Sequence, residues 1–268
     1  MIWDDRWDVV TPHQAAVARA YLGEQDRRRR HLVIYLSGAH AYGFPSPDSD
    51  LDLKCVHLAP TGDLVGLAPV DDPGDGVEII DGVEVDYGSN ELGPVLRGCI
   101  KGNGNYLERL LGELALGGDR ELLAEARPIV TALLSRRVAR HYGGFAASQL
   151  RAFDERPSAK RALYVLRTAA TGRHLLATGE LVTDLRRLPA YAPPGVDQLM
   201  TIKQRGEREP LTPADAAAWR DRLVAAIAAV DVAATDSVLP DEPTATAITA
   251  ADHWLRRVRR AYFDRAAT

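Results

Sequence analysis

The chain has 268 residues, of which 46% are hydrophobic and 26% are charged, and its formal net charge is -4. These are ordinary values for a globular protein that is long enough to bury one large core or two modest ones. The negative charge disfavours a protein that coats nucleic acid without specificity. No apolar run reaches the roughly 20 residues that a membrane span needs, and Cys55 and Cys99 are too few for a disulfide framework or a zinc site. We expect a cytoplasmic protein without a membrane partner.

The first third of the chain alternates between helical and extended patterns. Thr11 and Gln14, with Pro12 between them, have the composition of a capping box that begins a helix. Asp81-Gly82 separates two short alternating segments, which predicts a β-hairpin with a two-residue turn. The expected elements are a helix from 11 to about 30, strands over 31–36 and from about 50, an exposed loop over 69–76, and hairpin arms over 77–80 and 83–87.

After residue 90 the apolar residues recur every third or fourth position, which is typical of helices. From residue 119 onward the whole chain is predicted to be helical or connecting. The expected helices lie on either side of a break over 102–105, from a cap at Ser158 to Gly179, from a cap at Thr212, and from a cap near Thr249. The fold class is therefore α+β: a small mixed sheet with flanking helices over 1–117, followed by an all-α domain over 118–268.

Residues 36–58 are the most informative segment. Asp50 and Asp52 alternate with apolar residues at the start of a predicted strand. Successive strand residues face opposite ways, so the two carboxylates share one face. Folding does not require two like charges side by side, whereas a divalent cation explains them. Aspartate oxygens together with substrate phosphates are the usual arrangement around Mg²⁺, so the segment predicts a site for Mg²⁺ or Mn²⁺.

This segment resembles the signature of the polymerase-β-like nucleotidyltransferase superfamily, in which a strand, a glycine and a spacer precede Asp-x-Asp. Here the signature reads Gly38-Ala39-His40-Ala41-Tyr42-Gly43 and Ser49-Asp50-Leu51-Asp52. The fuller pattern is similar to the RlaP branch, the RNA-ligase-associated predicted nucleotidyltransferases. Residues 101–108 resemble that branch's Asn-Pro-x-apolar-apolar-Glu segment, with Gly104 where proline is common. The similarity extends over about residues 31–180.

The resemblance implies transfer of a nucleoside monophosphate from a nucleoside triphosphate to an acceptor hydroxyl, with release of pyrophosphate. Asp50 and Asp52 would be catalytic metal ligands, and a third carboxylate would come from a neighbouring strand. Asp86 is the favoured third acid and Glu84, on the same face, is its rival. Two ions held by such carboxylates stabilise the attacking and leaving oxygens of an in-line displacement.

The loop around the first glycine is expected to bind the nucleotide. Gly38 lets the backbone approach a ligand closely, and the amides after it would favour phosphate. Relatives usually carry serine at the next position, where this chain has Ala39, so Ser37 or backbone amides would compensate or the triphosphate would be held more weakly. The full set of expected nucleotide-binding residues is Ser37, Gly38, Ala39, Tyr42, Gly43, Ser49 and Asn103.

Several of these residues have simpler interpretations. Tyr42 either packs beneath the loop or stacks on a base, Ser49 either orients the loop or is a solvated turn residue, and Asn103 either contacts nucleotide or caps a helix, a role that Asn105 also fits. Lys54 is either a surface lysine or a phosphate ligand. The helix face with Lys160, Arg161, Tyr164 and Arg167 is either an ordinary charged face or a contact to nucleotide or acceptor.

The acceptor is left open by the sequence. RNA is the leading hypothesis, by association with the family, and a protein such as a partner toxin or a small aminoglycoside-like molecule is the alternative. A catalytically silent nucleotide-binding regulator is a different class. The departure at Ala39 leaves this class open, and the intact Asp50, Asp52 and Asp86 argue against it. The sequence names neither the preferred nucleotide nor the oligomeric state.

Overall fold

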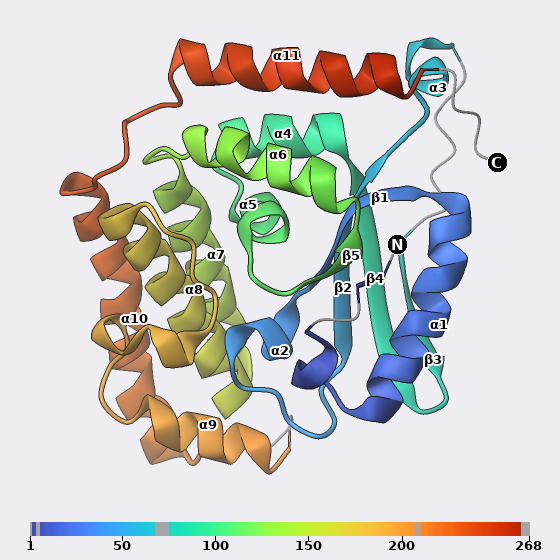
Figure 1. The fold of residues 1–268 in the computed structure, drawn as a ribbon. Helices are drawn as coiled ribbons and strands as arrows, with labels where there is room; N and C mark the ends of the chain where they lie inside the picture. Colours follow the sequence, from blue (N-terminus) through green and yellow to red (C-terminus); the bar gives the residue numbers. More distant parts are fainter. Residues whose placement is uncertain (1, 4–5, 68–74, 207–209, 264–268) are drawn as a thin grey trace.

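The computed structural model describes residues 2–3, 6–67, 75–206 and 210–263. These residues form an α+β fold built on a five-stranded mixed sheet with the order β3-β4-β2-β1-β5 (Figure 1). β2 and β4 pair in parallel, and the other neighbouring pairs are antiparallel. The strands are β1 (Arg30–Leu36), β2 (Leu51–Leu58), β3 (Gly76–Ile80), β4 (Val83–Glu91) and β5 (Ala115–Gly118). The predicted fold class and mixed sheet are confirmed.

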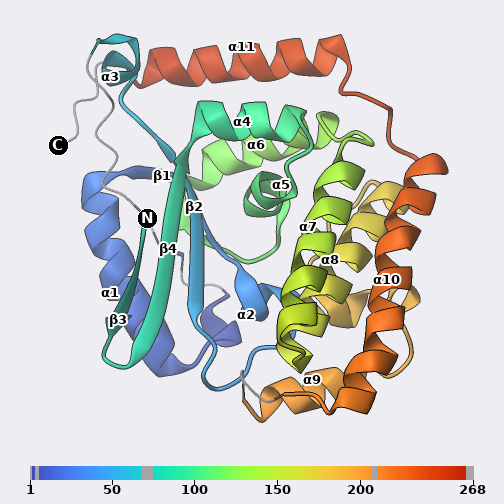
Figure 2. The ribbon, with the colours of Figure 1, turned by 180° about the vertical axis from the view of Figure 1, so that it is seen from behind.

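Helices cover both faces of this sheet. α1 lies against one face, and most of the other helices gather on the opposite side (Figures 1 and 2). The α-helices are α1 (Pro12–Arg28), α2 (Gly38–Tyr42), α3 (Thr61–Val65), α4 (Leu92–Ile100), α5 (Gly104–Leu111), α6 (Arg120–Ala132), α7 (Val138–Glu155), α8 (Ala159–Thr178), α9 (Val196–Gln204), α10 (Pro213–Thr235) and α11 (Ala245–Ala261). Short 3₁₀ turns lie at Trp7–Val9, Leu185–Arg187 and Pro189–Tyr191.

The elements predicted from local chemistry are present. At α1 the Gln14 amide donates to Thr11 Oγ1 at 3.2 Å and the Thr11 amide donates to Gln14 Oε1 at 3.0 Å, which completes the predicted capping box. The hairpin turn uses Asp81 and Gly82 at φ 48° and 79°, the left-handed backbone that a two-residue turn requires. Ser158 caps α8 as predicted.

Three predictions were wrong or fall outside the description. β5 is a strand in a region for which only helix was predicted. α11 begins at Ala245 with Thr244 as its cap, five residues before the predicted cap at Thr249, because the Thr244 hydroxyl accepts from the Ala247 amide. The predicted loop over 69–76 lies outside the described residues except for its last two positions.

Alternation along β1 and β2 separates two cores. Ile34 and Leu36 of β1 and Leu51 and Leu53 of β2 join the core under α1. Val33 joins the larger core on the opposite face, which extends through the helices. The β2 side chains that alternate with Leu51 and Leu53 therefore point toward the opposite face, which most of the helices cover. The predicted acid of this strand lies on that face.

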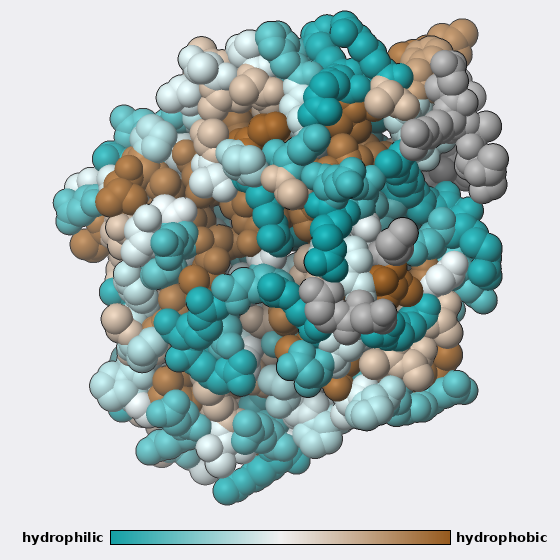
Figure 3. All heavy atoms as spheres, viewed as in Figure 1, coloured by the Kyte–Doolittle hydropathy of each residue, from teal (hydrophilic) through white to brown (hydrophobic). Residues whose placement is uncertain are grey.

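The surface in the view of Figure 3 is mainly hydrophilic, with hydrophobic residues visible in separate areas between the polar ones. Among the residues that the structure describes, none of the helices combines the length and the hydrophobicity needed to cross a bilayer. The domain division after residue 117 stays a prediction, and the larger core contains side chains from both parts.

Candidate active site

The sheet brings the predicted acids together. Asp52 of β2 is the register partner of Asp86 of β4, and because the two strands are parallel their side chains lie beside each other on one face. Asp50 directly precedes β2. Burial, followed by the negative charge of Asp50, raises the pKa of Asp52 to about 7; Asp86 adds to this effect, and Lys54 opposes it. Glu84, the rival third acid, is exposed.

Lys54 occupies part of this site. Its Nζ lies 2.6 Å from Asp86 Oδ1 and belongs to the same face of β2 as Asp52. Within the described part of the chain, no three acidic, histidine or cysteine side chains are arranged to hold a metal ion. Asp50 Oδ1 is buried and has no hydrogen-bond partner. A buried, unpaired carboxylate oxygen beside a carboxyl with a raised pKa suits a hard divalent cation, which takes oxygen ligands.

Gly38 is required by the position of Asp52. Its φ is +64°, and a Cβ at this residue would lie 1.7 Å from Asp52 Oδ2. The Ser37 amide also donates to the Asp52 carbonyl oxygen at 2.8 Å. Only glycine allows the carboxylate to lie against the turn between β1 and α2, since a side chain would both clash and strain the backbone. The glycine of the motif thus leaves room for the Asp52 carboxylate against this turn.

Ala39 and Ser37, the two residues considered for contact with the triphosphate, lie in different surroundings. Ala39 is fully buried in the larger core, so its side chain does not face the cavity described below. Ser37 does line that cavity, and its hydroxyl lies 3.1 Å from the Tyr42 hydroxyl. The role of Ala39 in nucleotide binding stays a prediction, and its buried side chain leaves only its backbone for such a contact in this cavity. A hydroxyl is available at position 37 instead.

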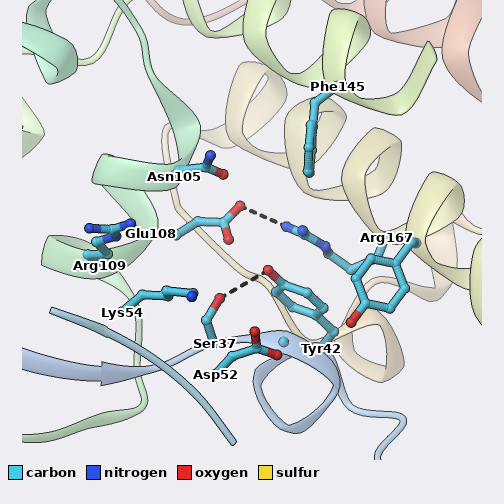
Figure 4. Close-up of a pocket in the computed structure, with 11 residues that line it drawn as sticks. Ser37, Tyr42, Asp52, Lys54, Asn105, Glu108, Arg109, Phe145 and Arg167 are labelled. Atoms are coloured by element: carbon cyan, nitrogen blue, oxygen red, sulfur yellow. Dashed lines mark hydrogen bonds and ion pairs between the residues drawn. The ribbon is translucent and has the colours of Figure 1, made fainter. Parts of the chain in front are cut away.

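A cavity of about 180 Å³ opens above Asp52, between the sheet and the helices (Figure 4). The sheet and α2 form one side, and α5, α7 and α8 form the other. Its lining residues are Ser37, Gly38, Tyr42, Asp52, Lys54, Asn105, Glu108, Arg109, Phe145, Tyr164 and Arg167. Polar and aromatic groups that are far apart in the sequence thus converge on the predicted metal ligand, which is typical of a ligand site.

A buried ion pair closes one side of the cavity. Arg167 Nη1 lies 2.7 Å from Glu108 Oε1, both side chains are less than 5% exposed, and Tyr142 donates its hydroxyl to the same oxygen at 3.2 Å. The Arg167 guanidinium also lies 3.6 Å from the centre of the Tyr42 ring. Tyr42 contacts Tyr164 edge to face. Tyr42 is therefore packed beneath the loop, as one of its two interpretations expected.

The sequence did not predict most of the residues on the side of the cavity that α5, α7 and α8 form. Glu108 was only the last residue of a family-like segment, and an ordinary charged face was the favoured interpretation of the helix that carries Arg167 and Tyr164. Asn105 lines the cavity, whereas Asn103 caps α5 by accepting from the Asn105 amide at 3.0 Å. Capping was one of the two interpretations of Asn103 and also suited Asn105, and the structure gives the cap to Asn103.

Ser49 and Gly43 lie outside the lining of this cavity and hold the motif loop in place. The Ser49 hydroxyl accepts from the Ser46 amide at 2.9 Å and from Lys203 Nζ at 3.0 Å. Gly43 has φ +85°, and a Cβ there would lie 2.0 Å from Asp184 Oδ1. The loop that carries Asp50 is thus fixed by contacts from the C-terminal half of the chain.

The structure thus places acidic residues on adjacent strands, beside a glycine turn and next to a polar cavity. The family model described as RlaP, the RNA repair pathway DNA polymerase beta family, matches residues 16–257. The chain therefore belongs to this family.

Two further comparisons are more distant. The chain is 27% identical over 158 residues to an uncharacterized protein from Methanocaldococcus jannaschii, and the match covers 57% of this chain and 63% of that relative. The chain therefore matches less than two thirds of the length of this relative. A crystal structure of a nucleotidyltransferase-like protein from Exiguobacterium sibiricum aligns over 94% of this chain and 81% of its own, with a TM-score of 0.32 and 12% identity.

Proposed function

We propose that the protein transfers a nucleoside monophosphate from a nucleoside triphosphate to an acceptor hydroxyl in a reaction that depends on a divalent cation. The acceptor oxygen attacks the α-phosphorus, the bond to the bridging oxygen of the β-phosphate breaks, and pyrophosphate leaves. The observation that carries this proposal is the pairing of Asp52 with Asp86 on adjacent parallel strands, directly against Gly38.

The residues present fit Mg²⁺ or Mn²⁺. Asp50 and Asp52 would hold the cation, because they supply an unpaired buried oxygen and a carboxyl that is costly to ionise without a compensating charge. Asp86 would join them once Lys54 moves away from its carboxylate. The bound cation would supply electrostatic stabilisation of the charge that develops on the transferred phosphate and the leaving oxygen.

Each remaining residue would have a separate task. Asp86 would accept the proton of the attacking hydroxyl, since it lies beside Asp52 and its side chain is partly exposed. Lys54 would leave Asp86 and bind the triphosphate, which exchanges one anionic partner for another. Ser37 would donate a hydrogen bond to the same group, in the place of the serine that position 39 lacks.

We propose RNA as the acceptor, supported by the description of the family as part of an RNA repair pathway. The direct experiment incubates the purified protein with each labelled nucleoside triphosphate, with Mg²⁺ or Mn²⁺, and with total cellular RNA and protein. We expect label in ribonuclease-sensitive material together with released pyrophosphate. Label on protein or on a small molecule would move the acceptor to the corresponding alternative. Absence of both label and pyrophosphate with all four nucleotides would contradict the proposal.

A further inference from the structure

A second cavity of about 480 Å³ adjoins the candidate active site, between the α4–α5 turn and the first half of α7. Its nine lining residues include the three cations Lys101, Arg137 and Arg140, and none of the nine is acidic. This local surface is basic in a chain whose net charge is -4. A basic hollow on a protein with net negative charge attracts anionic ligands to this place.

The two cavities share a wall. Phe145 of α7 lines both of them, and in the view of Figure 4 it lies across the first cavity from Asp52. Asn103, the N-cap of α5, lines the second cavity, and Asn105, whose amide donates to the Asn103 side chain, lines the first. A ligand that passes Phe145 can therefore extend from the basic hollow to the acids on the sheet.

Two glycines bring the turn against α7. Gly102 has φ +76°, and a Cβ there would lie 2.6 Å from the Arg137 carbonyl carbon. A Cβ on Gly104 would lie 2.5 Å from His141 Cδ2. The sequence Gly-x-Gly thus allows α5 to begin in direct contact with the basic and aromatic side chains of α7.

Along this wall two cationic residues, Arg137 and Arg140, are followed by two aromatic ones, His141 and Phe145. The rings of His141 and Phe145 stack with centroids 5.9 Å apart and an interplanar angle of 26°. Burial lowers the pKa of His141, which favours a neutral ring at physiological pH. Arg137 is already paired with Glu242, whereas Lys101 and Arg140 are exposed and make no ion pair within the residues that the structure describes. These two cations are available to a ligand.

We infer that this second cavity binds the acceptor as a single-stranded polynucleotide, with a terminal base on Phe145 and His141 and backbone phosphates on Lys101 and Arg140. Stacking platforms beside a cationic groove are the means by which proteins bind single strands without reading their sequence. A duplex hides its base faces and would lose the aromatic contact. The inference rests on the proposed function, since it supplies the acceptor end to the acids on the sheet.

The test measures binding of a fluorescent 12-nucleotide RNA, the same sequence as DNA, and the duplex, by anisotropy at several salt concentrations. Lys101→Ala/Arg140→Ala should weaken single-strand binding about tenfold and reduce the slope of log K against log salt by about 1.4, because each phosphate contact on a single strand contributes about 0.7. Phe145→Leu should weaken binding at least about fivefold without changing that slope. Stronger binding of RNA than of DNA would identify a contact to the 2′-hydroxyl, and equal binding would show a site indifferent to the sugar.

Arg27→Ala/Arg28→Ala is the matched control, because it removes two exposed charges from α1, which lies on the other side of the sheet. Equal losses in the control and in Lys101→Ala/Arg140→Ala would overturn the inference, as would equal binding of the duplex.

Titration with Mg²⁺ and a non-hydrolysable nucleoside triphosphate separates this inference from the proposed function. If the test variant loses nucleotide binding and keeps polynucleotide binding, the cavity belongs to the triphosphate and the inference is wrong. If wild-type protein binds no nucleotide, the proposed function fails instead.

Discussion

At the scale of single residues, the negative charges of the site are not fully compensated when no cation is bound. Lys54 compensates Asp86 at 2.6 Å, while Asp52 is buried beside Asp50, whose Oδ1 has no partner. Two carboxylates so close together cannot both ionise at low cost. Below about pH 7 the metal-free fold therefore favours a protonated Asp52, and a divalent cation would compete with that proton.

This balance predicts how stability depends on pH. A carboxyl whose pKa is raised from 3.8 to about 7 stabilises the fold below pH 3.8, and this contribution is lost as the pH rises through 7. Relative to Asp52→Asn, the wild-type free energy of unfolding should fall between pH 4 and pH 8, by at most about 4 kcal/mol, since one pKa unit corresponds to about 1.4 kcal/mol. Urea unfolding of both proteins in a chelator measures the difference. Parallel pH curves would show that Asp52 carries no raised pKa.

The third acid can be assigned by a pair of substitutions. Asp86→Ala should abolish transfer and leave binding of the metal–nucleotide complex measurable, because Asp50 and Asp52 remain. Glu84→Ala should reduce the transfer rate by less than about twofold, since its side chain is exposed and the substitution removes no buried charge. Initial rates and isothermal titration of the two variants decide the matter. Loss of activity in Glu84→Ala with full activity in Asp86→Ala would reverse the assignment.

Position 39 tests which hydroxyl serves the triphosphate. Ala39→Ser would bury a hydroxyl in the larger core, which costs about 1–3 kcal/mol if it finds no partner, and nucleotide affinity should not increase. Ser37→Ala should weaken nucleotide binding several-fold, because a net hydrogen bond contributes about 0.5–1.5 kcal/mol. Thermal unfolding and titration with a non-hydrolysable nucleotide separate the two effects. Tighter binding in Ala39→Ser would restore the serine-like role of position 39.

At the scale of elements, local chemistry made some segments predictable. The capping box of α1, the turn at Asp81-Gly82 and the cap at Ser158 each depend on residues a few positions apart. β5 was not predictable in this way. Its sequence Ala-Leu-Gly-Gly has little strand character, and it is extended because it pairs with β1, where a Cβ on Gly118 would lie 2.3 Å from the Leu32 carbonyl oxygen.

The same distinction applies to the site. The strand face with Asp50 and Asp52 follows from alternation within one segment, so the sequence alone predicted it. The parallel pairing of β2 with β4, and the faces that α5 and α8 turn toward the sheet, depend on contacts between distant segments. Glu108 and Arg167 are 59 residues apart and form one buried pair, which no pattern within either helix reveals.

The turn between β1 and α2 provides a test at this scale. Gly38→Ala should destabilise the protein and abolish transfer, because its Cβ would overlap the Asp52 carboxylate and the backbone would remain at φ +64°. Gly23→Ala is the matched control: it lies within α1 with no heavy atom within 4 Å of the new Cβ, and it should stabilise the protein by about 0.5–1 kcal/mol. Chemical unfolding and initial rates measure both. Normal transfer by Gly38→Ala would show that Asp52 does not depend on this glycine.

At the scale of the whole molecule, the C-terminal half contributes to both the core and the site. Side chains from β1 to α11 share the larger core, and α11 packs against α4 and α6. Arg259 of α11 lies 2.6 Å from Glu91 at the end of β4, and its carbonyl oxygen accepts from the Thr61 hydroxyl. α7 and α8 complete the cavity over Asp52. Residues after 117 are therefore needed to form the candidate site, wherever the domain boundary lies.

The most direct test of the central claim is transfer of label from nucleoside triphosphate to acceptor by the wild type, Asp50→Asn and Asp52→Asn, at equal protein concentration with Mg²⁺ or Mn²⁺. Circular dichroism and thermal unfolding would show that each variant is folded, and their stability should be unchanged or slightly higher because like charges no longer repel. We predict labelled acceptor and pyrophosphate from the wild type and a loss of at least about 100-fold in both variants, since each lacks a charge that the transition state requires. Wild-type rates in either folded variant would contradict the account.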